Sequence, residues 1–120
     1  MSGAEDDQVG VVDEDGDVFL RVQKKDDGSV QLMMAGTDDE TGVLILHELD
    51  EGPVAAPMGG RWEKITLVDP VDFPALRAAL GAPEGADVVA HLAAHFTGEA
   101  SWEVTRRIAE AGVPFEEEHG

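Results

Sequence analysis

The sequence predicts an α+β domain, in which an antiparallel sheet of about four strands (N-terminal half) carries two or three helices (C-terminal half) on one face. Two observations predict this arrangement. Apolar residues alternate with period two in the first half, a pattern typical of strands. The second half is rich in alanine and contains helix caps and helix-ending glycines.

The chain of 120 residues suits one domain and is too short for two of ordinary size. We expect a disordered acidic lead-in over residues 1–8, a single domain over residues 9–115 and an acidic tail over residues 116–120. No internal repeat and no inner linker divides the central part.

Two strands are predicted to form the first hairpin. In residues 18–25 every second side chain, beginning at Val18, is apolar, which predicts a strand with one buried face. Residues 26–28, Asp-Asp-Gly, supply the turn, because Asp-Gly tolerates positive φ. Residues 30–34 then return as the partner strand.

Two further strands and a loop complete the first half. Residues 43–48 are almost continuously apolar, which predicts a central strand covered on both faces. Residues 50–60 contain two prolines and a Gly-Gly pair, so we expect a long mobile loop there. Residues 61–68 alternate again as a strand.

Three helices are predicted in the second half. Asp72 is expected to cap a helix over residues 73–80, with a proline in its first turn. Either Asp87 or Glu84 begins the second helix, and Ser101 caps the third. Each helix is expected to stop at a glycine, namely Gly81, Gly98 and Gly112.

The charge balance excludes several classes of function. With 26 Asp and Glu against 8 Lys and Arg, the formal net charge is −18. Such a chain repels nucleic-acid phosphates and anionic lipid, so we expect neither nucleic acid nor membrane as a partner. Solubility or adaptation to salt is an alternative reason for the acidity. Arg61, Arg106 and Arg107 are expected to pair with carboxylates of the chain itself.

The sequence lacks the residues that several other kinds of chemistry require. The chain has no cysteine, which excludes disulfides, thiolate nucleophiles and cysteine-based metal sites. It has no phosphate-binding glycine loop and no dinucleotide motif, so we expect no cofactor. The N-terminus lacks the features of a signal peptide and no apolar run is long enough to span a membrane, which predicts a cytoplasmic protein.

His47 is the candidate for acid–base catalysis, with Glu48 beside it. Both lie at the predicted end of the most apolar strand, next to the loop of residues 50–60. Neighbouring strand residues point to opposite faces, so Glu48 can orient His47 only if the strand ends there. The alternative is that His47 is simply a solvent-facing residue at a strand end.

Two patterns suggest metal ions. His91 and His95 are four residues apart on a predicted helix, and Asp87 lies one turn earlier, so the three could share one ion. The alternative is ordinary hydrogen bonding of each histidine. Residues 13–17 have alternate carboxylates, but they lack the glycine and glutamate spacing of a calcium loop, and a hairpin turn between Val12 and Val18 explains them more simply.

The first functional hypothesis is an acidic binding protein that captures or inhibits a basic protein partner, as an immunity protein or a nucleic-acid mimic does. Because the acidic turns alternate between the two ends of a meander, we expect two acidic patches. The candidate binding residues are Asp13, Asp15, Asp17, Asp38, Asp39, Glu40, Trp62 and Met58.

The second hypothesis is a small cofactor-free enzyme that tailors a peptide or small-molecule substrate in a bacterial biosynthetic pathway, for example by forming a peptide cross-link. Its pocket is expected under the loop of residues 50–60, lined by Met33, Met58 and Trp62. A homodimer is also an expectation, because a meander leaves free edges and Met33, Met34 and Trp62 permit an apolar contact.

Overall fold

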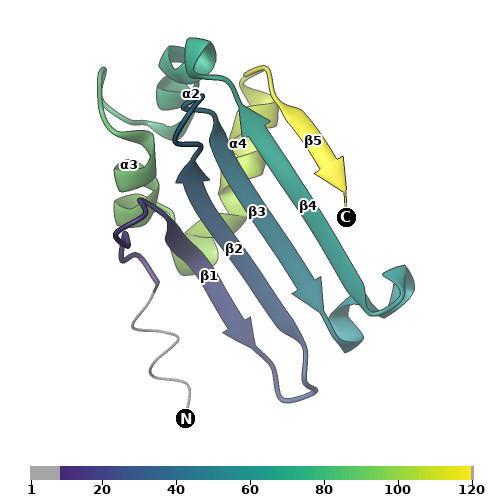
Figure 1. Ribbon diagram of the computed structural model, residues 1–120. Coiled ribbons are helices and arrows are strands. Elements are labelled where there is room, and N and C mark those ends of the chain that lie inside the picture. Colours follow the sequence, from purple (N-terminus) through teal and green to yellow (C-terminus); the bar gives the residue numbers. More distant parts are fainter. Residues whose placement is uncertain (1–8, 120) are drawn as a thin grey trace.

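The structure is a computed structural model that describes residues 9–119. The predicted lead-in, residues 1–8, lies outside the described part. The sheet has five antiparallel strands in sequence order, each paired with the next (Figure 1). They are β1 (Val18–Lys24), β2 (Val30–Thr37), β3 (Leu44–Glu51), β4 (Arg61–Val68) and β5 (Glu116–His119).

The helices follow β4, except for one short 3₁₀ helix between β3 and β4. The three α-helices all lie on the same side of the sheet (Figure 1). The helical elements are η1 (Pro53–Met58), η2 (Pro70–Asp72), α2 (Phe73–Leu80), α3 (Val88–His95), η3 (Gly98–Glu103) and α4 (Val104–Glu110). The predicted α+β class is confirmed, with one strand more than expected.

The sheet has one face under the helices, the covered face, and one open face. Leu44, Leu46 and Val68 point to the covered face and are fully buried against residues of α2, α3 and α4. The open face carries nine half-buried apolar side chains, which are Phe19, Val22, Val30, Leu32, Met34, Ile45, Leu49, Ile65 and Leu67. The expectation that the third strand is covered on both faces is therefore wrong, because Ile45 and Leu49 are only half-buried and no described element packs over the open face.

A β-bulge in β1 changes the side of the sheet to which its residues point. The register shifts between Phe19 and Arg21, so Leu20 and Arg21 both face the covered side and both are buried. Val22 then points to the open face, opposite Leu32. Strict alternation predicts Val22 on the face of Leu20, and the bulge overturns that prediction.

The C-terminal residues expected to be a solvated tail form β5. Residues 116–119 pair with residues 64–67 of β4, although all four β5 side chains are exposed. Backbone hydrogen bonding does not depend on side-chain polarity, and Lys64 attracts Glu117 across the pair at 3.7 Å. An acidic side-chain sequence can thus form an edge strand.

The helix starts differ in part from the expected caps. Asp87 does cap α3, since its Oδ1 accepts from the backbone N of Ala90 at 3.0 Å. Asp72 makes no side-chain cap bond, because Asp69 caps the preceding η2 turn instead. Ser101 lies inside η3 and is not a cap.

The expected loop of residues 50–60 contains η1. Its Ala55 is fully buried, and the backbone N of Val54 donates to Ser29 Oγ at 2.9 Å. The backbone N of Gly52 donates to Gly60 O at 2.9 Å and closes the segment at its base. This segment is therefore fastened to the sheet by hydrogen bonds and by one buried side chain.

Candidate functional site

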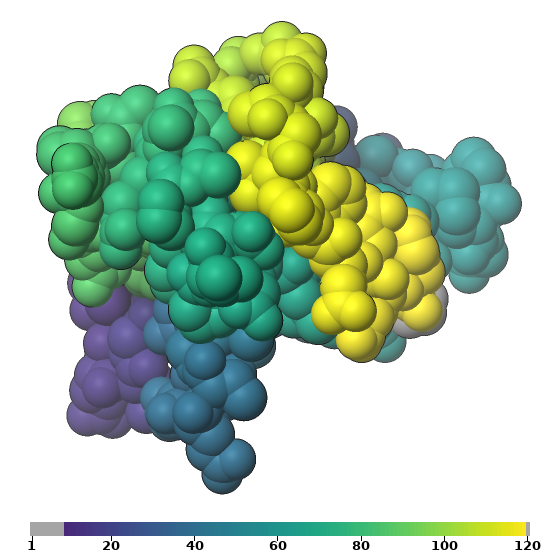
Figure 2. Space-filling model, turned by 90° about the horizontal axis from the view of Figure 1, so that it is seen from above, coloured from purple at the N-terminus to yellow at the C-terminus, as the bar shows by residue number. Residues whose placement is uncertain are grey.

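Most of the predicted acidic binding residues gather at one end of the sheet. β1 begins, β2 ends and β3 begins at this end, so the turns at residues 13–17 and 38–40 lie there together, whereas the turn at residues 26–27 lies at the other end. Figure 2 shows the two turns as neighbouring purple and blue lobes. We call this surface the acidic end; it comprises Asp13, Glu14, Asp15, Asp17, Asp38, Asp39 and Glu40. The expected division of the acidic turns into two patches is confirmed.

The two turns are held by their own first aspartates. Asp13 Oδ1 accepts from the backbone N of Asp15 at 2.9 Å and of Asp17 at 3.0 Å. Asp38 Oδ1 accepts from the backbone N of Glu40 and Thr41, and these bonds lower the pKa of Asp38 below its ordinary value. Asp13 and Asp38 therefore build the turns, while Glu14, Asp15, Asp39 and Glu40 are exposed to solvent.

The residues before the first turn do not form a hairpin with β1. Val9 makes a single parallel bridge to Phe19, and the backbone N of Gly10 donates to Phe19 O at 2.9 Å. The turn at residues 13–17 closes through Asp13 alone. Among residues 9–119, no group of three His, Asp or Glu is arranged to hold a metal ion, so the calcium alternative has no site.

The pKa of Asp17 lies above its ordinary value, in contrast to that of Asp38. Partial burial raises its pKa, and repulsion from Asp13, Asp15 and Asp39 raises it further. Asp17 also occupies the space above Gly36, because a Cβ atom at position 36 would lie 1.9 Å from Asp17 Oδ1. The fold therefore holds this charge close to other charges of the same sign.

The cations of the chain do not relieve that repulsion. The ion pairs of Arg21, Arg61, Lys64, Arg106 and Arg107 include no carboxylate of the acidic end. As expected, Arg61, Arg106 and Arg107 pair with carboxylates elsewhere, on Glu63, Glu103 and Glu110. The acidic end is thus a surface of unneutralised negative charge.

His47 and Glu48 are separated by the sheet. β3 continues to Glu51, so His47 points to the open face and Glu48 to the covered face. The condition under which Glu48 could orient His47 is not met. Instead, His47 Nε2 donates to Oε2 of Glu63 on the neighbouring strand β4. The other carboxylate oxygen of Glu63, Oε1, lies 3.7 Å from Arg61 Nη2.

The sequence did not identify Glu63 as the partner of His47, because the contact between the two depends on strand register. The two residues are 16 positions apart, and they meet only because His47 lies opposite Ile65 in the β3–β4 pair. The alternation of residues 61–68 does place Glu63 and Ile65 on one face. That pattern was the available signal, but it does not say which residues of β3 lie opposite.

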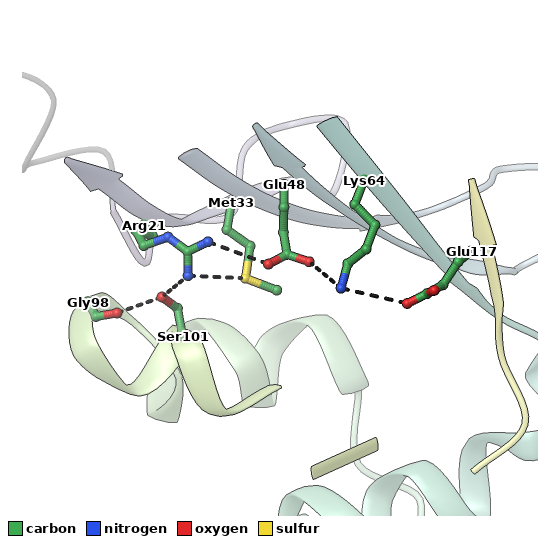
Figure 3. A network of polar contacts seen from close by, with 7 residues as sticks. All are labelled: Arg21, Met33, Glu48, Lys64, Gly98, Ser101 and Glu117. Carbon is green, nitrogen blue, oxygen red and sulfur yellow. Dashed lines mark hydrogen bonds and ion pairs between the residues drawn. The ribbon is translucent and has the colours of Figure 1, made fainter. Parts of the chain in front are cut away.

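Glu48 belongs to a row of charged residues across the covered face (Figure 3). Its Oε1 lies 3.6 Å from Arg21 Nη2, and its Oε2 lies 3.5 Å from Lys64 Nζ. Lys64 Nζ in turn lies 3.7 Å from Oε2 of Glu117 on β5, the last residue of the row. The row links four strands, and its central carboxylate is buried.

Arg21 connects this row to η3. Its Nη1 donates to Ser101 Oγ at 2.9 Å, and Ser101 in turn donates to Gly98 O at 2.6 Å (Figure 3). The guanidinium stacks on Trp102, 3.4 Å from the ring centroid. Arg21 is 1% exposed, and this burial lowers its pKa below the ordinary value, opposed by Glu48. These contacts attach the C-terminal half to the sheet.

The predicted metal ligands have other partners. Asp87 is occupied as the cap of α3, and His91 Nε2 donates to Leu80 O at 3.0 Å. The rings of His91 and His95 do lie close, with centroids 4.6 Å apart. Asp87, His91 and His95 nevertheless do not form a three-ligand group, as no such group occurs in the described part of the chain.

The remaining candidates lie away from the acidic end. Met58 is exposed in η1 at the opposite end of the sheet, and Trp62 points to the covered face opposite Asp50. The largest of three surface cavities, about 500 Å³, lies beside α2 and is lined by Pro74, Arg77 and Glu84 among others. None of the three is lined by His47, Met58 or Trp62. The expected pocket under residues 50–60 is not among them.

Comparison with known proteins gives no relative. No family model, no curated protein and no solved structure matches this chain. Among the described residues, no helix has the length and apolar character needed to cross a membrane. The site must therefore be interpreted from its own geometry and charge.

Proposed function

We propose that this protein is a non-catalytic binding protein whose acidic end captures a basic protein partner. One observation carries the proposal: burial and the neighbouring carboxylates of the acidic end raise the pKa of Asp17, and the ion pairs of Arg21, Arg61, Lys64, Arg106 and Arg107 all lie elsewhere. Like charges held close together weaken the folded state. A partner that supplies Lys or Arg removes that cost when it binds.

The charge also suits rapid association. A net charge of −18 attracts a basic partner over distances of about the Debye length, roughly 8 Å at physiological salt. Contact is then made at the acidic end, where Glu14, Asp15, Asp39 and Glu40 have no role in holding the turns through their side chains. A protein with clustered Lys and Arg, such as one that normally binds phosphate, fits this surface.

The test compares two variants of equal net charge. In the acidic-end variant, Glu14→Gln, Asp15→Asn, Asp39→Asn and Glu40→Gln remove four charges. In the control, Asp26→Asn, Glu51→Gln, Glu84→Gln and Glu118→Gln remove four charges elsewhere. Each tagged protein serves as bait in a cell lysate at low salt, followed by a salt step and mass spectrometry.

We expect one stoichiometric basic protein on the wild type and on the control, released by salt and lost from the acidic-end variant. Equal retention by both variants would show that net charge alone is responsible, and the proposal would be wrong. A bait that captures no basic protein would also overturn it.

The contact between His47 and Glu63 favours a second candidate, a small cofactor-free enzyme that acts on a peptide or small metabolite. Glu63 accepts from Nε2 of His47, which leaves Nδ1 as the atom that takes up a proton from a substrate. Any activity found with a peptide or metabolite library should be abolished by His47→Ala. It should be retained by Glu48→Gln, because Glu48 lies on the other face.

A further inference from the structure

The open face of the sheet is a broad apolar surface with no described element over it. The helices lie behind the sheet in Figure 1, and the side turned to the viewer is bare. Nine apolar side chains from β1 to β4 form it, and all are half-buried. Contiguous apolar surface of this kind marks an interaction site on a water-soluble domain.

The charge of this face differs from that of the whole chain. Over β1–β4 the open face carries two carboxylates, Glu51 and Glu63, and two cations, Lys24 and Arg61. The edge strand β5 adds Glu116 and Glu118, which lie opposite Leu67 and Ile65, so four carboxylates face two cations and the open face has a net charge of −2, although the chain carries −18. Two molecules of the same large charge can approach closely only where each presents a surface of such low local charge.

The size of the face is sufficient for a specific contact. At ordinary strand spacing and rise, the four strands β1–β4, of seven or eight residues each, give a face about 20 Å wide and about 25 Å long. Two such faces in contact remove about 1,000 Å² from water in total, the lower limit for a specific protein interface. No helix or loop of the described chain packs over this face.

We propose that a second copy of this chain occupies the open face, giving a homodimer whose two sheets pack face to face. The sheets would lie about 10 Å apart and be related by a two-fold axis. His47 and Glu63 lie within the contact, so each copy shields the other's pair from water. Of the residues expected at a dimer contact, Met34 is on this face, whereas Met33 and Trp62 point to the covered face.

Two alternatives to this dimer are less favourable: pairing of two copies through the edge strand β5, and a basic partner on the open face. Pairing through the free edge of β5 would bring the glutamates of residues 116–118 of two copies together, which is unfavourable. A basic partner gains little at a face of such low charge, because its cations find more carboxylates at the acidic end. The dimer proposal is thus independent of the proposed capture of a basic protein partner.

The first test measures mass against concentration by light scattering and sedimentation at physiological salt. We expect a dimer for the wild type and at least about 100-fold weaker association for Ile65→Glu, which places an unpaired charge in the contact. Val71→Glu is the control, because Val71 is 78% exposed and lies outside the sheet. Circular dichroism shows whether each variant is folded.

A second measurement keeps the proposal testable if Ile65→Glu fails to fold. The chain has no cysteine, so Met34→Cys and Val71→Cys each introduce one thiol. We expect alkylation of Met34→Cys to slow as protein concentration rises, while that of Val71→Cys stays constant. A wild type that stays monomeric at several hundred micromolar would overturn the proposal and leave the face to a different protein. A dimer that leaves the Met34→Cys rate unchanged would overturn it too.

Discussion

Arg21 and Trp102 stack on each other across 81 positions of sequence, with the guanidinium carbon 3.4 Å from the ring centroid. Trp102 is 41% exposed, whereas Arg21 is almost completely buried beneath it. The ring therefore acts as a cover that separates the guanidinium from water.

Removal of this cover should destabilise the fold. Trp102→Ala exposes Arg21 and removes the cation–π contact, and we expect a loss of about 2 kcal/mol in the free energy of unfolding. Trp102→Phe keeps an aromatic face and should lose less than half as much. Urea denaturation followed by circular dichroism measures both. Equal losses for the two variants would contradict the stacking argument.

The buried pair of Arg21 and Glu48 should behave as a unit. Glu48→Leu leaves Arg21 and Lys64 without their shared carboxylate, so we expect a loss of about 3 kcal/mol. The double variant Arg21→Met with Glu48→Leu removes both buried charges and should recover at least half of that loss. A double variant that loses the sum of the two single losses would show that the residues act independently.

Asp17 should weaken the fold at neutral pH. Its folded-state pKa lies above the unfolded value, so the folded chain holds that proton more tightly. The unfavourable contribution is fully present above the folded pKa and disappears as the pH falls through it. Asp17→Asn should therefore stabilise the protein by about 0.5 kcal/mol at pH 7, and the gain should vanish in acid. Thermal unfolding of both proteins across the acidic pH range measures this; a gain that persists in acid would contradict it.

The two helix starts provide a matched pair of variants. Asp87→Ala removes the hydrogen bond to the backbone N of Ala90 and should cost about 1 kcal/mol. Asp72→Ala, before α2, removes no cap bond and should cost clearly less. Chemical denaturation of the two variants side by side distinguishes them.

Local sequence patterns predicted much of the fold. The strands at residues 18–24, 30–37 and 61–68 and the helix at residues 73–80 follow from alternation, an Asp-Gly turn and a glycine stop. These signals are local, because each depends on residues within one element. The fifth strand has no such signal, since three of its four residues are glutamate and only the presence of β4 makes it a strand.

The candidate site, too, could be predicted only where it depends on local sequence and strand order. The gathering of two acidic turns at one end follows from the order of strands in a meander and could be predicted. The partner of His47 could not, because it depends on the register between β3 and β4. The burial of Arg21 could not either, because a single bulge residue turns it toward the helices.

The row of charges on the covered face also affects the order in which contacts form while the protein folds. Arg21 reaches Ser101, 80 positions later, and Lys64 reaches Glu117 near the C-terminus. Contacts between such distant positions form only after both partners are available. During synthesis the first hairpins can pair early, but Arg21 and Lys64 remain without Ser101 and Glu117 until those residues have left the ribosome.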